Sequence, residues 1–373
     1  MRRMSELPRH YSTESTPGDR GIGLGRAQGE RIHAALATYE QLFAGYGLSP
    51  VDVSALGEQA LQRIAALDPD LGTEIEGMAA GSGADLSMLG ALNARTEVLA
   101  GHECTTVACL GDVTRDGTPL GAQTWDWHRE LAPAVIVWTI DHPDGRRVQT
   151  LTEAGIVGKI GVSDAGVAVL LNILGHRDDG PPIGTPVHAL ARHVLDRATG
   201  AVEALQILAA ASVSASSSVT VVADDADGGV VCSVELWPAG PSFVTPNAEG
   251  RLVHTNHFLT HPAAEGDTMV RQGPDSVLRH DLAGRRLARL EAGSIDGEAL
   301  REVLTSHRGG PGAICAHPPE GAVLGEAWQT LATITVDPAH RTLDVRRGGP
   351  CGQVASTAPA ARQSDSRQGS AAS

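Results

Sequence analysis

The spacing of apolar residues changes part-way along the chain and divides it into two parts. In residues 27–100 the apolar side chains recur every three or four positions, as at Ile32, Leu36 and Tyr39. This period is typical of helices that bury one face, and Gly45 is well placed to end the first of them. We therefore expect the first hundred residues to be helical.

The start of this helical part has less regular features. Residues 1–20 are polar and contain Pro8, Pro17 and Gly18, so we expect a loose segment without regular structure before the first helix. The glycine-rich run GIGLG at residues 21–25 has neither the GxGxxG pattern nor a preceding strand, and we interpret it as a turn. Asp52 or Ser54 stands where a cap of the second helix is expected.

After residue 104 the period becomes that of β-strands. Short segments rich in Val, Ile and Thr alternate with turns that contain Gly, Asp and Pro. Helical spacing returns in residues 187–200, 201–211, 275–290 and 297–307. The predicted strands lie within residues 105–111, 119–125, 133–142, 146–154, 156–162, 166–174, 218–225, 229–238, 242–247, 251–256, 329–338 and 342–348.

This order of elements predicts an α+β fold. The order is helices, strands, two helices, strands, two helices and strands. Such elements can bury their apolar faces if two sheets stack face to face and the helices cover the outer faces. The prediction is a four-layer αββα sandwich over residues 104–352, preceded by the helical segment 1–103. Residues 353–373 consist mainly of Ser, Ala, Gln, Arg and Pro, and we expect a disordered tail.

Composition excludes several classes of protein. The chain has 29 Lys and Arg against 44 Asp and Glu, a net charge of −15, which argues against binding to a nucleic-acid backbone. No apolar run is long enough for a membrane span, and no apolar stretch of a signal peptide is visible. The cysteines are odd in number, scattered and without a CxxC pair, so we expect cytoplasmic free thiols rather than a structural zinc site. They are Cys104, Cys109, Cys232, Cys315 and Cys351.

Cys104 is the first candidate for chemistry. A cysteine is most often a small buried apolar residue, but this one begins a predicted strand and is followed by Thr105 and Thr106. A cysteine that begins a strand can serve as an N-terminal nucleophile once the preceding peptide bond is cut. The new α-amino group, with a pKa of ~8, would then act as the base for the thiol.

Two further residues have both a structural and a functional interpretation. Asp126 lies between Trp125 and Trp127 on a predicted strand, so its side chain points away from both rings. It is either a solvated aspartate of an edge strand or an acid that orients the nucleophile. Lys159 is the only lysine in the chain, which reflects either a coding bias toward arginine or a position that requires lysine.

A group of histidines lies in and just after the predicted strand segment 251–256. His254, His257 and His261 have a spacing that would gather ligands on a helix, but Pro262 and the β-branched start favour a strand and a turn. A metal site here is one alternative. Asn256 carries a neutral amide that is suited to donate to an oxyanion.

Taken together, these segments resemble one family. The chain is similar to the acyl-coenzyme A:6-aminopenicillanate acyltransferases, the peptidase C45 family of N-terminal nucleophile hydrolases, over roughly residues 20–350. The ordered set of motifs is more specific than any one of them. It comprises NARTE (93–97), ECTT (103–106), GAQTWDW (121–127), TEAGIVGKIGVSDAGVAVLLNIL (152–174), HTNHFLTHP (254–262), AICAH (313–317) and TLATITVDPAHRTLDVRRGGPC (330–351).

The resemblance implies a function and a set of roles. The bond between Glu103 and Cys104 would be cut by the chain itself. We expect residues 1–103 to stay bound as the small subunit of a heterodimer, because this helical segment has an apolar face to bury. A Cys104 acyl-enzyme would then form from a small acyl amide or acyl-CoA, with no cofactor and no metal. Cys104 would be the nucleophile, Asp126 and Asn256 would assist it, and Thr105, Trp125, Lys159 and His257 would support the substrate or the structure.

The sequence departs from the family pattern at three positions. Glu103 replaces a glycine before the nucleophile, and Thr124 replaces an asparagine. Ala316 replaces an arginine, whose role is taken over by Arg308, by His317 or by no residue. These changes leave the substrate open. The alternatives are an amidase similar to choloylglycine hydrolases or acting on N-acyl amino acids, a ligand-binding relative without catalysis, and a metal-dependent hydrolase built on the three histidines.

Overall fold

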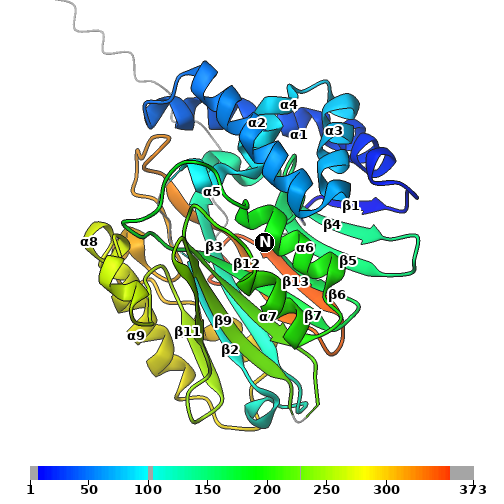
Figure 1. Cartoon of the computed structure of the whole chain (residues 1–373). Helices are drawn as coiled ribbons and strands as arrows, with labels where there is room; N and C mark the ends of the chain where they lie inside the picture. The colour runs from blue at the N-terminus through cyan, green and yellow to red at the C-terminus, as the bar shows by residue number, and fades with distance from the viewer. Residues whose placement is uncertain (1–6, 100–103, 227, 353–373) are drawn as a thin grey trace, which may run out of the picture.

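Two stacked β-sheets form the centre of the protein (Figure 1). We describe a computed structural model of the chain, which covers residues 7–99, 104–226 and 228–352. The larger sheet has eight strands in the order β1-β4-β5-β6-β7-β8-β9-β10, and the smaller has five in the order β11-β2-β3-β12-β13. Neighbouring strands are antiparallel, except that β1 runs parallel to β4.

The strands agree closely with the alternating segments of the sequence. Every predicted strand is present, although the segment 156–162 forms its strand only from Ile160 onward. The bounds are β1 Arg9–Ser12, β2 Cys104–Cys109, β3 Leu120–His128, β4 Val135–Asp141, β5 Arg147–Glu153, β6 Ile160–Ser163, β7 Val167–Ile173, β8 Ser217–Ala223, β9 Val230–Trp237, β10 Gly240–Val244, β11 Arg251–His254, β12 Trp328–Asp337 and β13 Thr342–Arg347.

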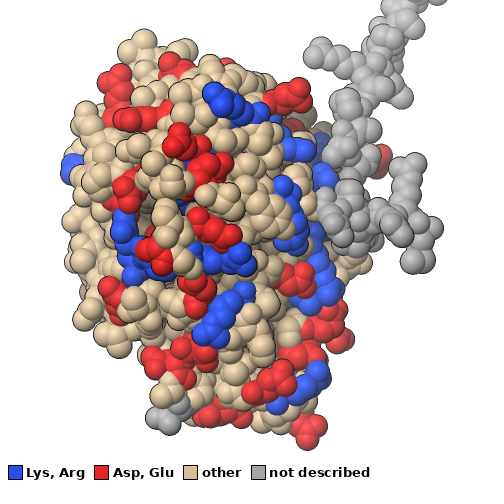
Figure 2. Space-filling view, turned by 90° about the vertical axis from the view of Figure 1, so that its right-hand side faces the viewer, with Lys and Arg blue, Asp and Glu red and all other residues tan. Residues whose placement is uncertain are grey.

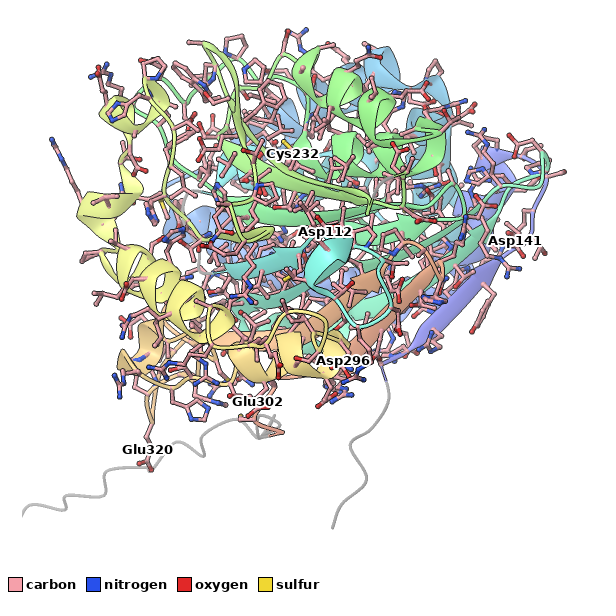
Figure 3. All side chains as sticks on the ribbon, turned by 90° about the horizontal axis from the view of Figure 1, so that it is seen from below. Asp112, Asp141, Cys232, Asp296, Glu302 and Glu320 are labelled. Carbon is pink, nitrogen blue, oxygen red and sulfur yellow. The ribbon has the colours of Figure 1, made fainter. Side chains whose placement is uncertain are left out.

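Helices cover the outer face of each sheet, so the predicted four-layer αββα sandwich is confirmed. Helices α6 (Val187–Arg197) and α7 (Ala201–Ala209) pack on the larger sheet, and α9 (Asp275–Leu287) and α10 (Gly297–Val303) pack on the smaller one. Seen from below in Figure 3, the two sheets lie between these helical layers, with Asp296 marking the start of α10. Strand β7 of one sheet contacts β2 and β3 of the other, which places the main core between the sheets.

The helices of the first hundred residues gather at one end of the sandwich, at the top of Figure 1. Their buried faces join the same apolar core as the sheets. They are α1 Pro17–Gly45, α2 Pro50–Leu67, α3 Pro69–Ser82, α4 Leu86–Asn93 and α5 Arg95–Val98. Short helical turns complete the structure as η1 Gly111–Val113, η2 Arg129–Ala134, η3 Ala263–Gly266, α8 Met269–Gln272 and η4 Gly310–Gly312.

The start of the chain differs from the sequence-based expectation. Residues 9–12 are not part of a loose lead-in: they form β1, which adds a parallel edge strand to the larger sheet. Helix α1 begins at Pro17, where the Thr16 hydroxyl accepts the backbone N–H of Asp19 and so caps the helix. The expectation of an all-helical first hundred residues was therefore wrong at this strand.

The glycine-rich run at residues 21–25 was expected to be a turn but lies inside α1. The reason is the close crossing of α1 and α3. A Cβ atom at Gly21 would overlap the backbone oxygen of Glu74, so glycine is what allows the two helices to approach. The next helix is capped by Ser49, with Asp52 completing a reciprocal capping box, rather than by Asp52 or Ser54 themselves.

Two surface properties bear on possible partners. No helix among the described residues is long and apolar enough to cross a membrane. On the face shown in Figure 2, basic and acidic side chains lie interspersed, so this face offers no broad positive field for a nucleic-acid backbone. The predicted tail at residues 353–373 lies outside the described residues.

Candidate active site

Cys104 is the first residue of β2 and lies between the two sheets. Its backbone N–H donates to Oδ1 of Asn256 at 2.7 Å. Its carbonyl oxygen accepts from Nη1 of Arg279 at 2.8 Å and from Nδ2 of Asn172, in the facing sheet, at 3.1 Å. The nucleophile candidate is thus fixed through both its backbone nitrogen and its backbone oxygen, and it is almost fully buried.

Asn256 follows β11, the strand that pairs with β2. Its backbone N–H donates to the Ser276 hydroxyl at 2.8 Å, and its Nδ2 donates to the Ile173 carbonyl at 2.8 Å. These bonds turn Oδ1 toward the nitrogen of Cys104. The structure thus places Asn256 beside Cys104, in a contact with the Cys104 nitrogen that the sequence did not indicate. Its role as a donor to an oxyanion stays a prediction.

Asp126 lies on β3, next to Cys104 on β2. Its backbone N–H donates to the Cys104 thiol, and its Oδ1 accepts from the Thr330 hydroxyl at 2.5 Å. Since β3 lies between β2 and β12 and the carboxylate is fully buried, the interpretation as a solvated edge residue is wrong. The Thr330 hydroxyl in turn accepts the backbone N–H of Ala316 at 2.9 Å, which orders this side of the site.

Burial raises the pKa of the Cys104 thiol to about 12, and the nearby charge of Asp126 adds to the shift. The positive charges of Arg279 and Lys159 and the N–H of Asp126 act in the opposite direction but do not outweigh it. The thiol of the uncut chain is therefore protonated at neutral pH, and it needs a base before it can act as a nucleophile.

Lys159 belongs to a buried group of charges under the site. Its ammonium pairs with Glu153, which also pairs with Arg95 at 3.1 Å and accepts the Tyr39 hydroxyl at 2.5 Å. Burial alone would raise the pKa of Glu153, but the charges of Arg95 and Lys159 lower it to about 2. The Lys159 Nζ lies 3.9 Å from the centroid of the Trp125 ring, a cation–π contact next to Cys104.

Arg279 is a site residue that sequence reasoning missed. Besides the Cys104 carbonyl, its guanidinium donates to Asn256 Oδ1 at 3.0 Å and to the Thr105 hydroxyl at 3.1 Å. It reaches the site from α9. The sequence of this helix shows only that Arg279 can pair with Asp275, four residues earlier, and does not indicate a contact with Cys104. Arg308, one of the proposed replacements for the arginine missing at Ala316, is exposed.

The three histidines near Asn256 do not converge on a common point. His254 is fully buried and pairs with Glu235 at 3.1 Å, whereas His261 is 81% exposed. His257 contacts the hydroxyls of Thr255 and Ser276 at 3.1 and 2.9 Å, so it supports the loop that carries Asn256. This arrangement removes the basis for a metal-dependent hydrolase built on these residues.

A cavity of about 220 Å³ adjoins the site at Ile173, the residue whose carbonyl holds Asn256. Val98, Ile173, Leu174 and Met269 form its apolar part, and Glu97 is among its polar lining residues. Burial raises the pKa of Glu97 to about 7. Glu103, the other side of the proposed cleavage site, lies outside the described residues.

The family model described as acyl-coenzyme A:6-aminopenicillanic acid acyl-transferase matches residues 113–351. The chain belongs to this family. A curated relative, the 40 kDa form of acyl-coenzyme A:6-aminopenicillanic-acid-acyltransferase from Emericella nidulans, is 31% identical over 353 residues, which cover 91% of this chain and 93% of the relative. The chain is accordingly an enzyme that transfers acyl groups or hydrolyses amide bonds.

Solved structures give a more distant likeness. The N-acylethanolamine-hydrolyzing acid amidase ortholog of Caenorhabditis elegans is 19% identical with a TM-score of 0.45, over 63% of this chain and 93% of the other. Penicillin V acylase from Agrobacterium tumefaciens is 13% identical with a TM-score of 0.40, over 65% of this chain and 83% of the other.

Proposed function

We propose that the chain is an autoproteolytic cysteine enzyme that transfers or hydrolyses acyl groups through a Cys104 acyl-enzyme. The observation that carries the proposal is the bond from the Cys104 nitrogen to Asn256 Oδ1. Cleavage before Cys104 would convert this nitrogen into an amine that is already held beside the thiol.

Maturation would begin with attack of the Cys104 sulfur on the carbonyl carbon of Glu103. The C–N bond breaks as the C–S bond forms, and the nitrogen of Cys104 takes up the proton lost by the thiol. Water then hydrolyses the thioester, which gives a carboxylate at Glu103 and restores the thiol. Arg279 and Asn172 would keep the Cys104 backbone in place during both steps, because they hold its carbonyl oxygen.

In turnover, the freed α-amino group of Cys104 would take the proton of the thiol. This step offsets the burial that otherwise keeps the sulfur protonated. The thiolate attacks the acyl carbonyl carbon. The leaving group takes a proton from the protonated α-amino group of Cys104, and an acyl-enzyme remains. Attack by water gives hydrolysis, and attack by an amine gives acyl transfer. Asn256 has a second N–H on Nδ2 besides the one used by Ile173, so it can also donate to the oxyanion.

The substrate we propose is a small acyl amide or an acyl-CoA. The apolar side of the cavity at Ile173, with Val98, Leu174 and Met269, is suited to an acyl chain. At Ala316 the backbone N–H serves Thr330, and no side chain is long enough there to hold a carboxylate. For this reason we do not restrict the amine part to a penicillin nucleus.

The two fragments would remain together as a heterodimer. Strand β1 pairs with β4 across the proposed cut, and Asn93 binds the backbone of both Gly155 and Val157. Separation would leave these buried polar groups without partners. We also propose a cytoplasmic location, which is compatible with five cysteines of which none is in a disulfide.

The test is the intact mass of the purified chain under denaturing conditions. Scaling 38.6 kDa by 103/373 and 270/373 gives about 11 and about 28 kDa for the expected fragments, the larger beginning at Cys104. Cys104→Ala should remain uncut and inactive. Cys109→Ala is the matched control, because Cys109 is buried at the other end of the same strand. A cut and active Cys104→Ala chain would disprove the proposal.

A panel of substrates then separates acyl transfer from hydrolysis. Acyl-CoA with an amine acceptor, bile-salt-like amides and N-acyl amino acids represent the three classes. A thiol-reactive acyl probe should label Cys104 in the cut chain. Failure to label a correctly cut chain would instead favour a relative that binds its ligand without catalysis.

A further inference from the structure

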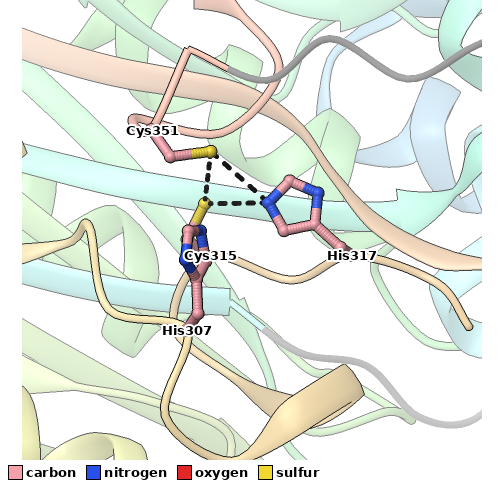
Figure 4. Close-up of side chains that lie close together, drawn as sticks. All are labelled: His307, Cys315, His317 and Cys351. Atoms are coloured by element: carbon pink, nitrogen blue, oxygen red, sulfur yellow. Dashed lines mark hydrogen bonds between the residues drawn. The ribbon is translucent and has the colours of Figure 1, made fainter.

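A second group of reactive side chains lies outside the site described above. It consists of His307, Cys315, His317 and Cys351, which come from three separate segments (Figure 4). His307 follows α10, Cys315 and His317 precede β12, and Cys351 follows β13. One sulfur or ring nitrogen from each residue can be chosen so that all four atoms lie within 4.8 Å of one another.

The distances within this group match those of a tetrahedral metal site. The two sulfur atoms are 3.5 Å apart, and Nε2 of His317 lies 3.6 Å from Cys315 Sγ and 3.4 Å from Cys351 Sγ. Zinc binds sulfur at ~2.3 Å and imidazole nitrogen at ~2.05 Å, so tetrahedral ligands are separated by ~3.8 Å (sulfur to sulfur) and ~3.5 Å (sulfur to nitrogen). Three of the four ligand atoms therefore already have the required separations.

The surrounding backbone is built to bring the sulfur atoms together. A Cβ atom at position 349 would overlap Cys315 Sγ, so Gly349 leaves the space in which Cys315 lies close to Cys351. The backbone N–H of Cys351 donates to the Cys315 sulfur, a contact of the kind that supports a metal-bound thiolate. Cys315 N–H also donates to the Ser306 carbonyl at 3.0 Å, which ties the segment of His307 to it.

We propose that His307, Cys315, His317 and Cys351 bind one zinc ion in a closed, four-coordinate site. Two thiolates and two neutral imidazoles are the donor set of structural zinc, and they leave no position for substrate. Binding releases two protons from the thiols to solvent, so the ion and its ligands together are neutral. A neutral site suits a place where Cys315 is buried and His317 and Cys351 are half-buried.

The sequence had pointed away from zinc because the chain lacks a CxxC pair. The ligands instead come as a Cys-x-His pair at 315–317, with one histidine before it and one cysteine far after it. This spacing resembles no short zinc motif. Only the fold, which places the segment after β13 beside the one before β12, brings the two sulfur atoms into contact.

The zinc site would also position a part of the active site. Cys315 and His317 flank Ala316, whose N–H donates to the Thr330 hydroxyl, and this hydroxyl donates to Asp126. The ion would hold Ala316 and thereby the orientation of the carboxylate next to Cys104. It would act through these residues and would not touch the substrate.

The first experiment measures metal in the full chain, purified without a polyhistidine tag and under reducing conditions. We expect one zinc per chain. After removal by a chelator, addition of Co²⁺ should give the visible bands of a tetrahedral ion together with thiolate-to-cobalt charge transfer. Cys351→Ser and His317→Ala should weaken zinc binding by more than the ~10–100-fold typical for loss of a mere supporting contact.

Matched controls exist for both ligand types. Cys232→Ser removes a buried cysteine of β9, labelled in Figure 3, and His261→Ala removes an exposed histidine. Both should keep zinc at the wild-type affinity. Cys104→Ala should also bind zinc, so that failure of the proposed catalytic function and failure of the zinc site can be told apart.

Two results would overturn the proposal. One is a folded, reduced wild-type chain that holds no zinc and gives no thiolate-to-cobalt band. The other is a chain in which Cys315 and Cys351 are joined by a disulfide after purification under the same reducing conditions. If a ligand variant fails to fold, the cobalt spectrum of the wild-type chain still decides the question.

Discussion

Replacement of Arg279 by methionine should slow maturation with little change in the rest of the fold. Arg279 is 2% exposed and makes charge-assisted bonds to the Cys104 carbonyl at 2.8 Å and to Asn256 Oδ1 at 3.0 Å. Methionine retains much of the length of the apolar stem but donates nothing. Both acceptors keep another partner, since Asn172 still donates to the carbonyl and the Cys104 N–H to Asn256.

The magnitude follows from these two bonds. A hydrogen bond to a charged group contributes ~1.5–3 kcal/mol, and because neither acceptor is left alone we take the lower end, about 3 kcal/mol for the pair. If this energy is needed to hold the Cys104 backbone for attack on Glu103, maturation slows by about 10²-fold. A displacement of reacting atoms by ~1 Å has a similar effect on rate. The Arg279–Asp275 pair adds little, because Asp275 can be solvated.

The assay follows the appearance of the two fragments on a denaturing gel during cell-free synthesis of the full chain. Arg285→Met is the control, since Arg285 lies on the same helix and has its own i,i+4 partner, Asp281, but is exposed. Arg279→Lys should mature at an intermediate rate, because one ammonium cannot reach all of the acceptors. A folded Arg279→Met chain that matures as fast as Arg285→Met would refute the reasoning.

Three further predictions concern buried groups. Burial raises the pKa of Glu97 from 4.5 to about 7, so the free energy of unfolding of the wild-type chain falls as pH rises through this interval. In urea unfolding, the free energy of unfolding of Glu97→Gln should exceed that of the wild type by about 3 kcal/mol at pH 8 but not at pH 4.5. An equal difference at both pH values would contradict this. Lys159→Met should lower the free energy of unfolding in urea by about 3–5 kcal/mol, because it leaves Glu153 buried without this partner. Adding Glu153→Gln should restore part of this loss, whereas additive losses would argue against a coupled pair. Gly21→Ala should lower stability in thermal unfolding by about 1–3 kcal/mol through the α1–α3 crossing, whereas Gly284→Ala, with open space around it, should raise it slightly.

The regular part of the fold could be predicted because its signals are local. Short apolar segments rich in Val, Ile and Thr, separated by turn residues, marked the strands, and helical spacing marked α6, α7, α9 and α10. Strand β1 could not be found this way. It has four residues, is partly exposed, and gains its partner β4 only through a contact more than a hundred residues away. The glycines of α1 were misjudged because they allow the close approach of α3, and their own segment gives no sign of this contact.

The candidate site divides in the same manner. Cys104, Asp126 and Asn256 were candidates from their place on the predicted strands, the resemblance to a family assigned their roles, and the structure brings them together. Arg279 was missed since an arginine on an amphipathic helix looks like any surface charge until the helix is placed. Such residues depend on tertiary packing, which a single sequence does not encode in any short pattern.

The edge strand β1 and helix α1 come from before the proposed cut, yet they complete the sheet and enclose Glu153 through Tyr39. An intact chain acquires this arrangement as a single molecule, at a rate independent of dilution. Once cut and then denatured, the two pieces would have to meet by diffusion, so the yield of renaturation would fall as the sample is diluted. Maturation would thereby become a one-way event, and the lifetime of the enzyme would rest on how slowly it opens.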